Sequence, residues 1–113
     1  MPLYEQHCSA DLTPQILTDE QCHHYLKEIP DWTYSSINKE ISRTLSFKNY
    51  QQTLAFINAI ADVIHQENHH PDIEFSYNKC TIKFTTHSVN GITLFDFICA
   101  SHIDQLILKN NIT

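Results

Sequence analysis

The chain has 113 residues, of which 42% are hydrophobic, and this length allows one domain with one core. A net charge of −6 disfavours a general nucleic-acid binder, because such proteins normally present a basic surface. No apolar run approaches the roughly 20 residues that a membrane helix needs, so we expect no membrane partner.

The cysteines and the N-terminal residues bear on the cellular compartment. None of the four cysteines belongs to a C-x-x-C pair typical of zinc ribbons or thioredoxin-like sites. Residues 1–7 lack the basic and then apolar pattern of a signal peptide. We therefore expect a cytoplasmic protein whose thiols are reduced.

The chain start predicts loose order followed by a short helix. We expect one domain over residues 1–113, with residues 1–11 loosely ordered. The apolar side chains available to pack there are Leu3, Leu12 and Ile16. Thr18-Asp19-Glu20-Gln21 has the pattern of a capping box and predicts a helix to about residue 27, before Pro30.

The middle of the chain predicts a hairpin and then a long helix. Residues 32–35 and 40–47 have the length and alternation of strands, and the second has one mostly apolar face. From residue 49 to about 68, apolar residues recur at spacings of three and four, which indicates a helix with one apolar stripe. Such a helix would be about 28 Å long, enough to cross a four-stranded sheet.

The last third of the chain repeats the hairpin and helix. Residues 73–77 and 80–85 alternate as strands, and Thr93 with Asp96 predicts the start of a final helix that ends near residue 108. The order is therefore α-β-β-α-β-β-α. We predict an α+β fold in which three helices pack on one face of a four-stranded antiparallel sheet.

The second hairpin predicts that two histidines meet. With Asn78-Lys79 as a two-residue turn, Tyr77 opposes Cys80, and the apolar and polar side chains separate onto two faces. Extending this register places His70 opposite His87, with Cβ atoms about 4.5–5.5 Å apart.

Two further histidines lie just before this hairpin. His69 stands at the junction with the long helix, and His65 lies one helical turn earlier. Histidine exchanges protons near neutral pH, and two close imidazoles disfavour simultaneous protonation. One can then act as a base while another acts as an acid, which suits a dehydration.

Two other interpretations of these histidines stay open. A His-His pair before a strand is often a surface or capping feature. Three histidines can also hold zinc, although the His65–His69 segment has its Glu third rather than second in the H-x-x-x-H spacing. We expect no bound metal, and we expect the remaining histidines to be exposed and without a role: His7, His23, His24 and His102.

Several short motifs are specific when taken together. They are His69-His70-Pro71-Asp72, Tyr77-Asn78-Lys79, Thr86-His87, Gly91, Thr93 and Asp96, with Trp32 after Pro30 upstream. In type and spacing this pattern resembles the pterin-4a-carbinolamine dehydratase family over roughly residues 12–108.

The resemblance implies an activity and a set of site residues. Members of that family have the same α-β-β-α-β-β-α order and dehydrate 4a-hydroxytetrahydropterin to quinonoid dihydropterin, which recycles the cofactor of aromatic amino-acid hydroxylases. They need no metal or organic cofactor and form homodimers or homotetramers. The catalytic histidines map onto His69, His70 and His87, and supporting or substrate-binding residues onto Asp96, Pro71, Thr86 and His65.

The resemblance also suggests roles for the histidines. We expect His70 to accept the N5 proton of the pterin, His87 to protonate the departing hydroxyl group, and His69 to orient the substrate. Asp96 either orients an imidazole or favours the helix N-terminus. The family commonly has an acid four residues before the first histidine, where this chain has His65, with Glu67 two residues later.

The sequence is also compatible with two rival functions. Some relatives of this fold pair with transcription factors as dimerisation partners, which would make the chain a non-enzymatic binding protein. A small metal-binding protein is the other.

Overall fold

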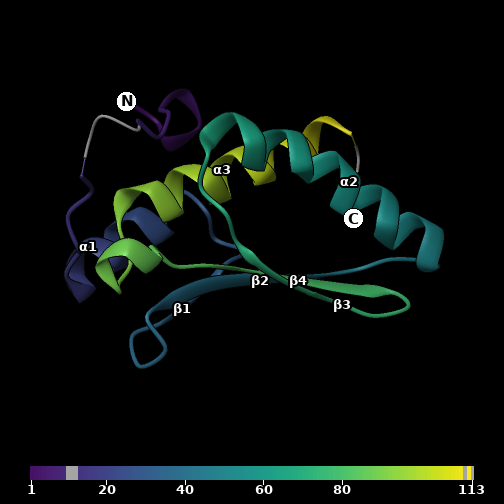
Figure 1. The fold of residues 1–113 in the computed structure, drawn as a ribbon, viewed down its shortest axis with the longest axis horizontal. Helices are drawn as coiled ribbons and strands as arrows, with labels where there is room; N and C mark the ends of the chain where they lie inside the picture. Colours follow the sequence, from purple (N-terminus) through teal and green to yellow (C-terminus); the bar gives the residue numbers. More distant parts are fainter. Residues whose placement is uncertain (10–12, 111, 113) are drawn as a thin grey trace.

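The computed structural model describes residues 1–9, 13–110 and 112, and it confirms the expected α+β order. The elements run α1 (Asp19–Leu26), β1 (Thr33–Ser35), β2 (Glu40–Ser46), α2 (Tyr50–Glu67), β3 (Asp72–Phe75), β4 (Lys79–Phe84) and α3 (Leu94–Lys109), with 3-10 turns η1 (Leu3–Glu5) and η2 (His87–Val89). All three helices lie on one side of the sheet (Figure 1). Across the described part of the chain, no helix combines the length and apolarity needed to span a membrane.

The sheet places the two hairpins side by side. Its strand order is β1-β2-β4-β3, and all neighbours are antiparallel. Apolar side chains of the two central strands point toward the helices and are at most 3% exposed: Ile41, Leu45, Cys80, Ile82 and Phe84. The alternation of each strand therefore builds one buried face, as the sequence predicts.

The register of the second hairpin differs from the predicted one by two residues. Phe75 opposes Cys80 and Ile73 opposes Ile82, so Tyr77 and Asn78 form the turn. A shift of two keeps every side chain on its own face, so polarity alone could not reveal it. The turn is fixed instead by distant partners, because the Tyr77 and Asn78 carbonyls accept hydrogen bonds from the Thr53 hydroxyl and the Phe47 amide.

The helix starts follow the predicted capping residues. Thr18 and Gln21 form the capping box of α1, and Thr93 and Asp96 form that of α3. The Asn49 side chain accepts from the Gln52 amide at the start of α2. Each cap satisfies amides that the first helical turn leaves without a partner.

The N-terminal segment, residues 1–9, is attached to the core, which differs from the loose order expected for it. The Leu3 side chain is 1% exposed, and its amide donates to Glu28 Oε1 over 2.9 Å. Turn η1 packs against α3. Ile16 is 57% exposed, and Leu12 lies outside the described residues together with positions 10 and 11. One buried leucine and several polar contacts hold the segment, and all of them depend on tertiary structure.

Candidate active site

The His69 side chain is held in place where α2 gives way to β3. Asn68 ends the helix in the left-handed conformation (φ 51°) and turns the chain. The His69 ring stacks on Phe84 with centroids 5.9 Å apart and meets the edge of Phe95 at 6.0 Å. Only 12% of the His69 side chain is exposed. This imidazole therefore has little freedom to rotate.

Asp96 fixes the orientation of that ring. Its side chain is fully buried, and Oδ1 lies 2.6 Å from His69 Nε2. Oδ2 accepts hydrogen bonds from the Thr93 amide and the Thr86 hydroxyl, both over 2.9 Å. Asp96 thus does both things that the sequence left as alternatives, since it caps α3 and orients an imidazole.

The hydrogen bonds around Asp96 determine which His69 nitrogen is available. The Thr86 hydroxyl donates to Asp96, so the Thr93 hydroxyl, 2.8 Å away, must donate to Thr86. With Asp96 as a carboxylate, His69 Nε2 carries a proton and donates it to Oδ1. Nδ1 is then the nitrogen of neutral His69 that can accept a proton.

His70 and His87 do not oppose one another in the ladder, which corrects the predicted pairing. Strand β3 begins after His70 and β4 ends before His87, which lies in turn η2. The observed register would place His70 opposite Thr85 if it continued. Even so, His87 Nε2 lies 3.7 Å from Asp72 Oδ2, so His87 stays close to the segment that follows His70.

The other predicted site residues have different degrees of exposure. His70 and His65 are exposed, and 69% of the His87 side chain is exposed. Pro71 is partly buried, and Thr86 is buried in the Asp96 network. The structure therefore presents the fixed imidazole of His69 and the exposed imidazoles of His70 and His87 at the end of the sheet where β3 begins and β4 ends.

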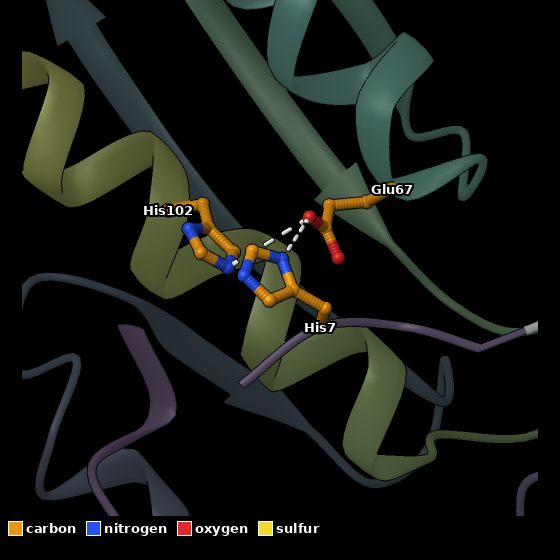
Figure 2. A group of neighbouring side chains, drawn as sticks. All are labelled: His7, Glu67 and His102. Carbon is orange, nitrogen blue, oxygen red and sulfur yellow. Dashed lines mark hydrogen bonds and ion pairs between the residues drawn. The ribbon is translucent and has the colours of Figure 1, made fainter. Parts of the chain in front are cut away.

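A second group of imidazoles and a carboxylate was missed by the sequence analysis. His7 Nδ1 donates to Glu67 Oε2 over 2.7 Å, and the Cys8 amide donates to Glu67 Oε1 over 2.7 Å. His102 Nε2 lies 3.9 Å from the same Oε2, and Figure 2 shows the three side chains converging. The prediction that His102 is exposed is wrong, since only 17% of its side chain is exposed. His7, His23 and His24 are exposed as expected.

The environment of Glu67 favours its charged form. Burial alone would raise its pKa, but the hydrogen bonds from His7 and the Cys8 amide, together with the nearby His102, lower the pKa below its ordinary value.

The four cysteines are free thiols, and Cys8 Sγ lies 3.7 Å from Cys99 Sγ. That thiol contact, with burial, raises the pKa of Cys99.

Comparison with known proteins identifies the family. A family model described as pterin 4 alpha carbinolamine dehydratase matches residues 15–106. The chain belongs to this family. The match includes His69, His70, His87 and Asp96, and it excludes His7. The family resemblance seen in the sequence is confirmed.

Individual relatives agree over most of the chain. A Bdellovibrio bacteriovorus protein is 48% identical over 96 residues, which cover 81% of this chain and 78% of the relative. A Legionella pneumophila protein (strain Corby) is 44% identical over 108 residues, which cover 94% of this chain and 96% of the relative. Both carry the name pterin-4-alpha-carbinolamine dehydratase as a provisional assignment.

Solved structures share the fold. A Brucella melitensis protein described as a transcriptional coactivator/pterin dehydratase superposes with a TM-score of 0.75 at 25% identity, over 81% of this chain and 98% of that one. A pterin dehydratase-like protein described as a RuBisCO assembly factor of the alpha-carboxysome has a TM-score of 0.57 at 22% identity, over 67% of this chain and 88% of that one. The second similarity concerns the fold alone.

Proposed function

We propose that this chain dehydrates a 4a-hydroxytetrahydropterin to a quinonoid dihydropterin and water in the cytoplasm. The observation that carries the proposal is His69 held by the fully buried Asp96 beside the exposed His70 and His87. All four residues lie in the part of the chain that the family model matches. A buried carboxylate that orients one imidazole near two others is suited to acid–base chemistry.

The proposed reaction moves two protons and breaks one bond. His70 takes the proton from N5 of the pterin, and the electron pair of that N–H bond forms the N5–C4a double bond. The C4a–O bond breaks, and the departing hydroxyl leaves as water with a proton from His87. His70 then returns its proton to solvent and His87 regains one, so the enzyme ends unchanged.

His69 and its neighbours would position the substrate. Because Asp96 occupies Nε2, Nδ1 of His69 is available to accept a hydrogen bond from the pterin. Thr86 supports this arrangement through Asp96, and Pro71 limits the backbone that follows His70. His65 would contribute at the edge of the site. The proposed steps use imidazoles alone and no cofactor.

The decisive test is a stopped-flow dehydration assay with freshly generated carbinolamine. Replacing His70 and His87 together with Ala should lower turnover by about 10²-fold or more, since each would supply a proton-transfer step. Both side chains are exposed, so circular dichroism and Tm should remain near wild type. His24→Ala, an exposed histidine in α1, is the matched control. Near-full turnover of the double variant would contradict the assignment.

A binding function without catalysis is the second candidate. It is motivated by the Brucella melitensis relative, whose description joins coactivator and dehydratase. Wild-type protein that binds a protein partner but does not accelerate dehydration would favour it. We also propose a homodimer or homotetramer that works beside an aromatic amino-acid hydroxylase. Light scattering would measure the oligomeric state, and a coupled hydroxylase assay would test the link.

A further inference from the structure

Three side chains from separate parts of the chain converge away from the proposed catalytic histidines. His7 belongs to the N-terminal segment, Glu67 is the last residue of α2, and His102 lies within α3 (Figure 2). One ligand atom from each lies within 4.8 Å of the other two. Within residues 1–9, 13–110 and 112, this is the one group of three such side chains close enough to share an ion.

The chemistry of the group matches a known type of metal site. Two imidazole nitrogens and one carboxylate oxygen bind zinc and the neighbouring divalent ions of the first transition row. We propose that His7, Glu67 and His102 form a binding site for one such ion, with Zn²⁺ as the representative. The site would join the N-terminal segment to α2 and α3.

The distances require only small movements. Bonds of about 2.0–2.2 Å to the ion place neighbouring ligand atoms roughly 3.0–3.5 Å apart. Glu67 Oε2 is 2.7 Å from His7 Nδ1 and 3.9 Å from His102 Nε2, which bracket that range. The His7 side chain is 58% exposed, so its ring can shift without disturbing the core.

Only one of the two imidazoles hydrogen-bonds to the carboxylate. His7 bonds to Glu67, whereas His102 Nε2 lies 3.9 Å from the same oxygen and bonds to the Gln6 carbonyl instead. The two imidazole rings nevertheless stack, with centroids 5.1 Å apart and planes 21° apart. An ion between the three side chains would be coordinated by both imidazole nitrogens, and its positive charge would balance the negative charge of the buried Glu67 carboxylate.

Backbone groups of the N-terminal segment hold two of the three side chains in place. The Cys8 amide holds the other carboxylate oxygen of Glu67, which fixes the orientation of the carboxylate. His102 Nε2 donates to the Gln6 carbonyl over 2.7 Å, so ion binding would move that proton to Nδ1 and leave the carbonyl oxygen as a further possible ligand. A cavity of about 180 Å³ is lined by Glu67 and Cys8 but not by His7 or His102, so it adjoins the group on the side of the carboxylate.

The test uses the full-length protein after treatment with a chelator. Isothermal titration with Zn²⁺ alone should show one ion per chain with a Kd of about 10 µM or tighter. Co²⁺ should give the visible absorption of a low-coordinate nitrogen and oxygen site. At ion concentrations about 100 times Kd, Tm should rise by about 10 °C because the ion binds the folded state.

Variants distinguish this site from the other histidines. His7→Ala and His102→Ala should each weaken Zn²⁺ binding by at least about 10-fold, and Glu67→Gln should do the same. His7→Ala removes an exposed side chain and tests the site even if Glu67→Gln fails to fold. The controls are His24→Ala and His70→Ala, which should leave Kd unchanged. Binding that is absent in the wild type, or that survives His7→Ala and is lost in His70→Ala, would overturn the proposal.

Discussion

Two buried carboxylates bond to imidazoles in this fold, and their similarity is informative. Each carboxylate accepts a hydrogen bond from a histidine on one oxygen and from a backbone amide on the other. The amide is that of Thr93 for Asp96 and that of Cys8 for Glu67. Asp96 makes its contacts within the matched family region, whereas Glu67 reaches His7 outside it. The same local chemistry thus orients a ring beside exposed histidines in one place and attaches a chain segment in the other.

The two imidazoles differ in how tightly the protein encloses them. The His69 ring lies against Phe84 and Phe95 and is 12% exposed, whereas the His7 side chain is 58% exposed. A fixed ring can orient a substrate, because the cost of ordering it is met when the protein folds. A more exposed ring such as that of His7 has room to shift when a ligand binds.

Replacing His69 with Ala should have the largest effect. Turnover should fall by about 10²–10⁴-fold, because the oriented nitrogen beside the substrate is lost. The measurement is kcat/KM for fresh carbinolamine by stopped flow. His7→Ala, which changes the other pair, should lose at least tenfold less. Equal losses in the two variants would mean that the two regions do not differ in function.

Replacing Asp96 with Asn should have the next largest effect, through His69. The amide can turn its NH₂ group toward His69, which would force Nε2 to accept and move the ring proton to Nδ1. We expect turnover to fall by about 10–100-fold, equivalent to roughly 1.4–2.7 kcal/mol of barrier.

The ¹⁵N chemical shifts of His69 would report the change of tautomer directly. Loss of turnover with an unaltered His69 tautomer would contradict this account of Asp96. Urea unfolding should show a smaller loss, of about 1–2 kcal/mol, because the carboxamide oxygen can still accept from Thr93.

Replacing Glu67 with Gln should affect stability more than catalysis. The neutral side chain weakens the hydrogen bonds from His7 and the Cys8 amide, at a cost of about 1–2 kcal/mol. Amide hydrogen exchange at Leu3 and Cys8 should accelerate as the N-terminal segment loosens. Turnover should fall at least tenfold less than in Asp96→Asn. Unchanged exchange at both amides would show that Glu67 does not hold the segment.

The sequence was sufficient where the determining contacts are local. The capping boxes at Thr18 and Thr93 each lie within four residues, and so both helix starts were predicted correctly. Strand alternation gave the buried face for the same reason. The family motif groups Asp96 and His69 in one proposed site although they are 27 residues apart, and the structure places the two side chains within hydrogen-bond distance.

The sequence was insufficient to predict features that depend on contacts between residues far apart in the chain. The hairpin register depends on Phe47, the residue after β2, and on Thr53 in α2, which donate hydrogen bonds to the two turn carbonyls. The partial burial of His102 depends on the Gln6 carbonyl, 96 residues away. Neither contact leaves a periodic signal, so the His70–His87 pairing and the exposure of His102 were predicted wrongly.

The smallest expected effect concerns Asn68, the residue between the two pairs. Its left-handed backbone ends α2, so that Glu67 points toward the N-terminal segment while His69 turns toward Asp96. Asn68→Ala should cost about 1 kcal/mol in urea unfolding, because a Cβ without a polar group disfavours this conformation. Asn68→Gly should remain within about 0.5 kcal/mol of wild type, since glycine adopts it freely. If Ala and Gly were equally tolerated, a positive φ at this position would not be what separates the two carboxylate–imidazole pairs.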